Sequence, residues 1–146
     1  MDAKKQLLGT WQLIAIEAQT SEGEKIYPFG DSPTGLLMYD PNNLMSVVLM
    51  RAERKKFESN DPFNATAEEI TGAFHGLEAY CGSYQINEDD KSITHYVQAS
   101  RFPNWEKSEQ IRFYNFNNNS LTLTTAPIML KDTQWTVKLV WEKAIN

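Results

Sequence analysis

Side chains that exchange protons or bind anions gather in two neighbouring stretches of this sequence, at Tyr80, Tyr84, His95 and Arg101. Within each stretch they are separated by even numbers of residues, and the side chains of a β-strand alternate between its two faces. His95 and Arg101 share their face with apolar residues, and the more apolar face of a strand is expected to point inward. The two phenols and the imidazole are therefore predicted to share one interior wall.

This group of side chains suits two kinds of chemistry. A guanidinium such as that of Arg101 binds a carboxylate or enolate oxygen, so the group could anchor the polar end of an otherwise apolar ligand. An imidazole titrates near neutral pH, so His95 could instead act as a catalytic base or acid, with Tyr80 or Tyr84 as its partner. A third interpretation is a filled core, in which His95 only hydrogen-bonds a tyrosine and Arg101 only ends its strand. Residue types alone leave the three open.

The predicted ligand-binding residues extend this wall with apolar and aromatic side chains. Met45 and Val47 share one face of a strand whose two faces are both apolar, which leaves the orientation of the strand undecided. Trp105 follows a proline-fixed turn that would lie either at the rim of the fold or in a packed corner. The full predicted set is Met45, Val47, Tyr80, Tyr84, His95, Val97, Arg101, Trp105 and Trp135.

The other reactive residues are assigned no chemistry. The only two histidines, His75 and His95, are far apart in the sequence and have no cysteine pair beside them, so no metal site is predicted. Cys81 alternates with Tyr80 and is expected on the outer face as inert packing. His75 is expected in solvent or at the mouth of a cavity. No motif predicts a cofactor.

Alternating apolar and polar residues predict β-strands along most of the chain. Turn residues join the strands into hairpins, at 40–43, 87–91 and 115–120. Strands are expected at 8–18, 25–28, 36–39, 44–51, 80–86, 92–100, 110–114, 121–126 and 134–143. About eight strands with short connections favour a single all-β domain over residues 1–146, an antiparallel up-and-down β-barrel. An open sheet half-wrapped around a helix is the alternative.

One stretch, at about residues 66–79, predicts a helix. Thr66 and Glu69 have capping-box spacing, and Ile70 and Phe74 begin an apolar stripe with helical spacing. This stripe is expected to lie against the barrel. Glycines within the helix each cost about 1 kcal/mol relative to alanine, so the helix should depend on docking and could serve as a movable lid.

Composition limits the class of partner. The chain has 14 basic and 19 acidic residues and a formal charge of −5, which argues against nucleic acid as a partner. The basic cluster between Arg51 and Lys56 is expected to be a solvated loop. A single cysteine excludes an internal disulfide, and neither a secretory leader nor a membrane span is expected. We therefore expect a cytoplasmic protein.

Several segments resemble the lipocalin-like domain proteins of bacteria and fungi, which are calycin-type barrels. Gly9-Thr10-Trp11 resembles the Gly-x-Trp signature that opens lipocalins, and matching segments follow in order at 27–30, 35–39, 45–51, 80–84 and 102–105. The resemblance implies a ligand-binding barrel in which Trp11 closes the narrow end beneath a basic residue, here Lys143 or Lys138. The Thr-Asp-Tyr signature and the cysteine pair of secreted lipocalins are missing, which argues against a secreted carrier of the retinoid type.

The resemblance and the residues together predict a cytoplasmic lipocalin-like barrel that binds one small hydrophobic or amphipathic molecule in its cavity, without a cofactor or a metal. One alternative is a small-molecule isomerase or cyclase that acts by proton transfer in the same cavity. Another is a protein-interaction module with a filled barrel. The ligand and the oligomeric state stay open.

Overall fold

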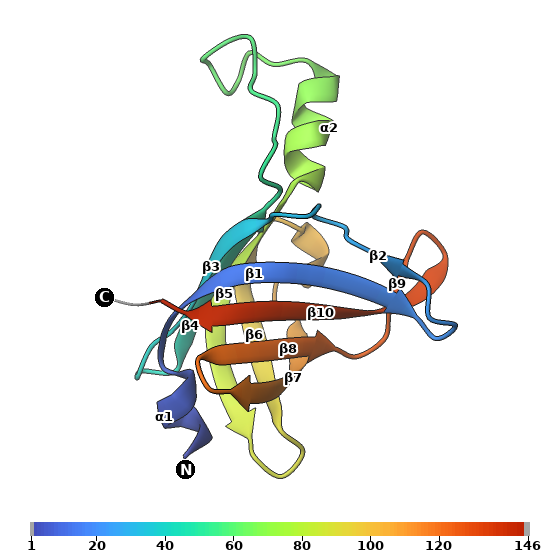
Figure 1. The fold of residues 1–146 in the computed structure, drawn as a ribbon. Helices are drawn as coiled ribbons and strands as arrows, with labels where there is room; N and C mark the ends of the chain where they lie inside the picture. Colours follow the sequence, from blue (N-terminus) through green and yellow to red (C-terminus); the bar gives the residue numbers. More distant parts are fainter. Residues whose placement is uncertain (1, 145–146) are drawn as a thin grey trace.

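Eight antiparallel strands close into a barrel in the computed structural model, which describes residues 2–144 (Figure 1). Each strand pairs with the next around the ring, and the last pairs with the first. The ring consists of β1 (Gly9–Thr20), β3 (Thr34–Tyr39), β4 (Leu44–Met50), β5 (Leu77–Asn87), β6 (Ser92–Ser100), β7 (Glu109–Asn117), β8 (Ser120–Thr125) and β10 (Thr133–Lys143). The predicted barrel is confirmed, and the open sheet is wrong because the pairing of β1 with β10 closes the ring.

Two short strands lie outside the ring. β2 (Lys25–Ile26) pairs with the end of β1, and β9 (Ile128–Leu130) pairs with the start of β10. These two ends of β1 and β10 are themselves paired, so the extra strands lie at the same end of the barrel. β2 was expected from the sequence, whereas β9 was not.

Tight turns join neighbouring strands as the sequence predicted. Asn43, Lys91 and Asn118 have positive φ angles of 67°, 56° and 57°, in the left-handed region that such turns require. In the first of these turns, the carboxylate of Asp40 accepts hydrogen bonds from the backbone N–H groups of Asn42 and Leu44, at 2.9 and 2.8 Å. The side chain therefore fixes the turn that joins β3 to β4.

Alternation along the strands decides which side chains face the interior. On β4 the buried set contains Met45 and Val47, which answers the question that two apolar faces left open in the sequence. On β5 the buried set contains Tyr80 and Tyr84, as expected, and the neighbouring Cys81 is only half-buried on the other face. The interior wall predicted from the spacing of these residues is therefore present.

One extra residue, Gln98, interrupts β6. Val97 pairs with Gly82, and Ala99 pairs with the residue before Gly82, so the pairing shifts by one position. Such a β-bulge reverses the alternation beyond it, and Ala99 is exposed although it was placed on the interior face. A Cβ on Gly82 would lie 1.9 Å from the carbonyl oxygen of Tyr96, so the two strands approach too closely for any other residue.

Trp11 closes one end of the barrel and is 2% exposed. The ammonium of Lys143 lies 4.6 Å from the centre of its ring and donates a hydrogen bond to the carbonyl of Leu8. A cation over an indole face is held by the ring quadrupole. Lys143, and not Lys138, therefore has the position that the lipocalin resemblance implied.

A short helix that the sequence did not predict covers this end. Helix α1 (Ala3–Leu7) is capped by Asp2, and its last carbonyl accepts a hydrogen bond from the indole N–H of Trp11 at 2.8 Å. Gly9 connects α1 to β1 with φ +118°, and a Cβ there would lie 2.9 Å from Nζ of Lys143. Both the backbone and the packed lysine therefore require glycine in the Gly-x-Trp segment.

Helix α2 (Ala67–His75) projects from the opposite end of the barrel (Figure 1). Thr66 and Glu69 form the predicted capping box at its start. The helix ends earlier than expected, because β5 already begins at Leu77. None of its residues is buried and Ile70 is 54% exposed, so the prediction that its apolar stripe lies against the barrel is wrong.

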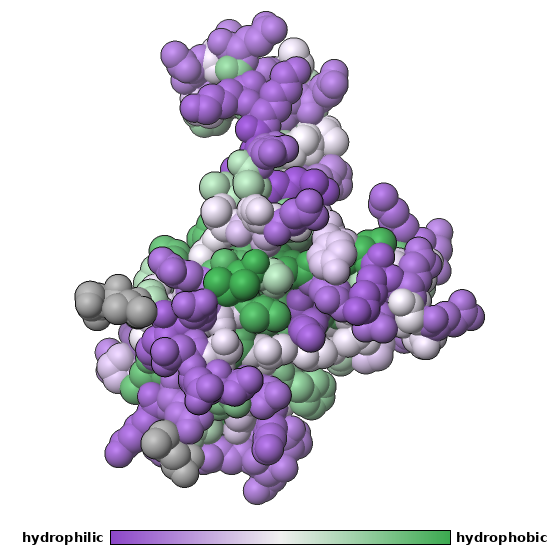
Figure 2. Space-filling view, in the orientation of Figure 1, coloured by the Kyte–Doolittle hydropathy of each residue, from purple (hydrophilic) through white to green (hydrophobic). Residues whose placement is uncertain are grey.

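Helix α2 is held by contacts with the loop that precedes it, and not by packing against the barrel wall. The guanidinium of Arg54 donates to the carbonyl of Ala73 at 3.3 Å, and the Glu69 carboxylate accepts the backbone N–H of Glu58 at 2.9 Å. The loop and α2 form a hydrophilic lobe above the barrel in Figure 2. No helix among residues 2–144 has the length and apolar character needed to cross a membrane.

The outer face of β1, β3 and β4 carries exposed apolar side chains, visible as a green patch in Figure 2. They include Ile14, Leu36, Met38 and Val48, all between 42 and 48% exposed. Because neighbouring residues on these strands point inward, this surface is separated from the interior by the thickness of the sheet.

Candidate functional site

His95 lies inside the barrel between two tyrosines that come from different strands. Its Nε2 is 2.6 Å from Oη of Tyr39 on β3, and its Nδ1 is 2.7 Å from Oη of Tyr80 on β5. All three side chains are buried, with His95 only 1% exposed. Both nitrogens of the imidazole are therefore in hydrogen bonds. The phenols beside His95 are Tyr39 and Tyr80, whereas the sequence predicted Tyr80 and Tyr84.

Burial controls the charge of this cluster. Burial, assisted by the positive charge of Arg112, lowers the pKa of His95 to about 3, so the imidazole is neutral at neutral pH. Burial also raises the pKa of Tyr39 and of Tyr80, and the nearby Arg112 opposes both increases. The cluster is therefore a chain of neutral hydrogen-bonding groups at neutral pH.

A cavity of about 510 Å³ begins beside this cluster and continues through the barrel. Exposed or partly exposed residues line its outer part, so the cavity opens at the end of the barrel from which α2 projects. We call this opening the mouth and define it by Phe74, His75, Phe102 and Met129. The wall further inside is mostly apolar and includes Ile16, Leu37, Val47, Leu49, Leu123, Val137 and Leu139.

Arg112 supplies a positive charge in the wall of the cavity. It comes from β7, on which residues 110, 112, 114 and 116 are half-buried and the alternate residues are exposed. Its guanidinium donates to the carbonyl of Ile111 at 3.0 Å, and no ion pair of Arg112 is formed within residues 2–144. Arg112 is therefore a cation at the cavity without an acidic partner in the described chain.

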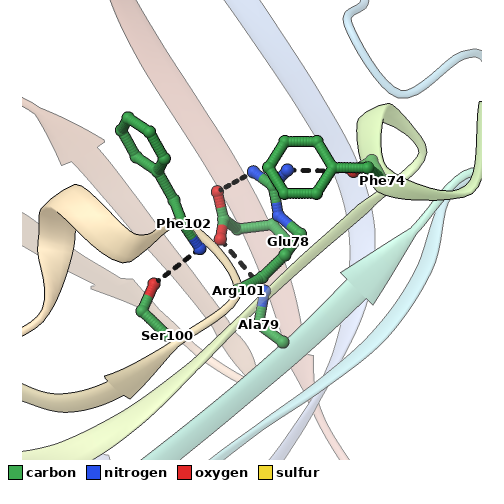
Figure 3. A network of polar contacts seen from close by, with 6 residues as sticks. All are labelled: Phe74, Glu78, Ala79, Ser100, Arg101 and Phe102. Carbon is green, nitrogen blue, oxygen red and sulfur yellow. Dashed lines mark hydrogen bonds and ion pairs between the residues drawn. The ribbon is translucent and has the colours of Figure 1, made fainter. Parts of the chain in front are cut away.

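Arg101 also lines the cavity, but both terminal nitrogens of its guanidinium are already bonded (Figure 3). It forms an ion pair with the carboxylate of Glu78 at 3.1 Å and donates to the carbonyl of Phe74 at 2.9 Å. It also lies 4.0 Å from the centre of the Phe74 ring. The sequence placed Arg101 as an anchor inside the barrel, whereas the structure places it at the mouth, where it connects β5 to the last turn of α2.

Trp105 lines the cavity from the short 3₁₀ helix η1 (Pro103–Trp105). Its ring packs edge-on against Tyr80, with 5.8 Å between ring centres, and against Phe102, with 5.9 Å between ring centres. Trp105 therefore fixes the position of the Tyr80 ring in addition to contributing apolar surface.

The predicted ligand-binding residues divide into two groups. Val47, Tyr80, His95, Arg101 and Trp105 line the cavity, whereas Met45, Tyr84, Val97 and Trp135 do not. Met45, Tyr84 and Val97 point inward as expected but belong to the packed core, where the Tyr84 hydroxyl, for example, donates to the carbonyl of Asp40 at 2.8 Å. Trp135 is buried but lies outside that core and lines a separate pocket with Gln19 and Pro127. Pointing inward is therefore not sufficient to reach the cavity.

Sequence reasoning missed Tyr39 and Arg112. Tyr39 ends β3 directly before the turn at Asp40, and alternation from the buried Leu37 would have placed it inside. Arg112 had a weaker signal, because both faces of its strand carry aromatic or aliphatic residues.

A closed eight-stranded antiparallel barrel is the architecture of the up-and-down β-barrels, whose interior is filled by side chains or holds one small ligand. Within that class the chain belongs to the lipocalin-like domain family, whose model matches residues 8–144. A relative in Aspergillus oryzae, the 4'-hydroxy-3'-methoxypropiophenone carrier protein ppsC, is 26% identical over 106 residues, which cover 68% of this chain and 96% of the relative. A crystal structure of a lipocalin-like protein from Bacteroides uniformis aligns over 95% of this chain and 99% of that chain, with a TM-score of 0.47 and 14% identity.

Proposed function

We propose that this protein binds one small, mostly apolar molecule in the interior of its barrel. The observation that supports this most is the cavity of about 510 Å³, which is open at the mouth and lined largely by aliphatic and aromatic side chains. Pockets of this size and character, with a few convergent polar groups, are typical of small-molecule sites. The alternative, an interaction module with a filled barrel, agrees less well with a cavity of this size.

The chemistry of His95 favours binding over proton-transfer catalysis. A catalytic base needs a pKa near the working pH and a nitrogen free to reach the substrate. The pKa of His95 is lowered to about 3 by burial and by Arg112, and both of its nitrogens are in hydrogen bonds to tyrosines. We therefore place Tyr80 and His95 in the proposal as a polar floor for a ligand, with Tyr39 behind them, and not as an acid–base pair.

The comparison with the Aspergillus relative supports a carrier role. That protein is named as a carrier of 4'-hydroxy-3'-methoxypropiophenone, a small aromatic molecule with polar oxygens. A ligand of comparable character, hydrophobic or amphipathic, suits a wall in which Trp105 and Phe29 accompany the Tyr80–His95 floor. The proposal includes a cytoplasmic location for the protein.

Native mass spectrometry of protein purified from its own host tests the proposal. We expect a single small-molecule adduct per chain, released on denaturation. Val47 and Val48 provide a matched pair, because they are adjacent on β4 and are 4% and 47% exposed on opposite faces. Val47→Phe should fill part of the cavity and abolish the adduct, whereas Val48→Phe should retain it. Equal adducts in both variants would contradict binding inside the barrel.

A further inference from the structure

The two distances at His95 leave the direction of its hydrogen bonds open, and the burial of Tyr39 favours one direction. Tyr39 is fully buried, lies outside the cavity wall, and has His95 Nε2 as its hydroxyl partner within residues 2–144. If Nε2 carried the proton, the Tyr39 O–H would be left without an acceptor, and a buried unsatisfied donor is strongly unfavourable. Tyr39 therefore donates to Nε2.

The direction of this hydrogen bond determines which imidazole nitrogen carries the proton. A neutral imidazole carries one N–H, so the proton lies on Nδ1, which donates to Oη of Tyr80. The burial that lowers the pKa of His95 to about 3 keeps the ring in this neutral form. The Tyr80 oxygen is thus an acceptor toward His95, and its own O–H is left to donate elsewhere.

The space beside Tyr80 is the cavity. No protein acceptor for its hydroxyl hydrogen is found in the described part of the chain, where the Tyr80 oxygen pairs with His95. Arg112 opposes the rise in the pKa of Tyr80 that burial produces, both by its charge and by a side-chain hydrogen bond in which the guanidinium donates to the phenolic oxygen. A phenolic O–H and a guanidinium are therefore presented together to the same cavity.

The side-chain acceptors in the rest of the wall are already in use. Among the described residues that line the cavity, Glu78 is the only carboxylate and is paired with Arg101 at 3.1 Å, and the Thr125 hydroxyl accepts the backbone N–H of Val137 at 3.0 Å. Trp141 lines the cavity and is 1% exposed, and its indole N–H is buried without a partner in residues 2–144. Within residues 2–144 the site therefore holds more donors than the chain satisfies, and it holds a cation, Arg112, without a counterion.

We infer that the ligand is an organic acid, with an apolar body in the barrel and a carboxylate that accepts hydrogen bonds from Tyr80 Oη and the Arg112 guanidinium. This inference rests on the proposed binding function and names the chemical class of its ligand. A carboxylate is an acceptor-only group that matches a guanidinium and a hydroxyl donor together. Tyr39 and His95 act as positioning residues, because their hydrogen bonds orient the Tyr80 O–H toward the carboxylate.

The tautomer of His95 can be tested without a ligand. In protein labelled with ¹⁵N-histidine, long-range ¹⁵N–¹H correlation spectra distinguish the protonated ring nitrogen from the bare one. We expect Nδ1 of His95 to be protonated in the wild type, and Tyr39→Phe to abolish this preference. Protonation at Nε2 in the wild type would overturn the inference, because Tyr80 would then donate to His95 instead of to the cavity.

Two probes of nearly the same shape test the acidic group. 2-Naphthoate and 2-acetylnaphthalene differ in having a carboxylate or a neutral methyl ketone, and quenching of the cavity tryptophans Trp105 and Trp141 reports their binding. We expect naphthoate to bind at least about tenfold more tightly than the ketone, as a charge-assisted hydrogen bond predicts. Arg112→Gln should remove this advantage, and Tyr80→Phe should weaken naphthoate binding by about tenfold.

Lys138→Gln is the matched control, because it removes one positive charge from an exposed position of the barrel wall. It should leave the preference for naphthoate unchanged. Arg112→Lys, which keeps the charge, is the second variant to use if Arg112→Gln folds poorly, and it should retain part of the preference for naphthoate.

Ketone binding equal to naphthoate binding in the wild type would overturn the acidic ligand and leave the proposed cavity binding intact. Failure of both probes to bind would overturn the two together.

Discussion

Tyr39 and His95 are separated by 56 positions in the sequence, yet the phenolic oxygen and the ring Nε2 lie 2.6 Å apart at the centre of the barrel. The contact joins β3 to β6 across the interior, so it forms only where the run β3-β4-β5-β6 curls back on itself. Its partner contact, between His95 Nδ1 and Tyr80, joins β6 to its direct neighbour β5.

Stability should fall as the pH is lowered from 7.5 to 5. The unfolded chain protonates His95 near pH 6.5, whereas burial and Arg112 lower the pKa in the folded protein to about 3. Folding therefore excludes this proton, and the stabilisation, complete above pH 6.5, is lost at about 1.4 kcal/mol per pH unit toward pH 3. Urea unfolding should report a loss of about 2 kcal/mol between pH 7.5 and 5 from this residue.

His95→Gln should remove that part of the pH dependence, and His75→Gln, at an exposed position on α2, should retain it. An unchanged slope in His95→Gln would contradict the buried neutral imidazole.

Tyr39→Phe should destabilise the fold by about 1 to 3 kcal/mol, because it leaves His95 Nε2 buried without its hydrogen-bond donor. Tyr27→Phe removes the same hydroxyl from a side chain that is 51% exposed, and it should change the free energy of unfolding by less than about 0.5 kcal/mol. Chemical unfolding of both variants measures the difference. Equal effects would contradict the buried contact.

Gly9→Ala should lower the melting temperature, whereas Gly72→Ala should not. Gly9 has φ +118°, and an added Cβ would lie 2.9 Å from Nζ of Lys143, so alanine strains the backbone and displaces the lysine from Trp11. A Cβ on Gly72 meets nothing within 4 Å, and alanine favours a helix by about 1 kcal/mol relative to glycine. Calorimetric scans measure the melting temperature of each variant. An unchanged melting temperature in Gly9→Ala would contradict the tight packing of Lys143 over Trp11 at this end of the barrel.

Arg101→Met should loosen the last turn of α2 without unfolding the barrel. The substitution removes the hydrogen bond to the Phe74 carbonyl and the ion pair with Glu78, which connect this turn to β5. Amide hydrogen exchange should become faster in α2, while the amides of the β1–β10 pairing keep their protection. Unchanged exchange in α2 would mean that the loop through Arg54 is sufficient to hold the helix.

The sequence predicted the barrel well because its strands alternate clearly and its turns carry Asp, Pro and Asn. The strand 92–100 has the bounds expected for it. The interior placement of Tyr80 and His95 followed from the same alternation, which is a local property. The prediction that the helix docks on the barrel was wrong. The amphipathic spacing of a helix carries no information about the length of the preceding loop, and that loop holds α2 away from the barrel.

The rest of the site depends on features that alternation cannot express. The bulge at Gln98 changes the end of β6, so Arg101 lies at the mouth beside Glu78 instead of inside. On β7 a choice by hydrophobicity would have turned Ile111 and Phe113 inward, whereas both are more than 40% exposed and Arg112 faces the cavity. The pairing of β7 with β6 and β8 fixes that orientation.

A crystal structure of the protein grown with 2-naphthoate tests the central claim most directly. The account predicts density for one molecule inside the barrel, with its carboxylate against Tyr80 Oη and Arg112 and its rings toward Trp105. An interior filled by repacked side chains, with naphthoate absent or bound only on the outer face of β1, β3 and β4, would contradict it.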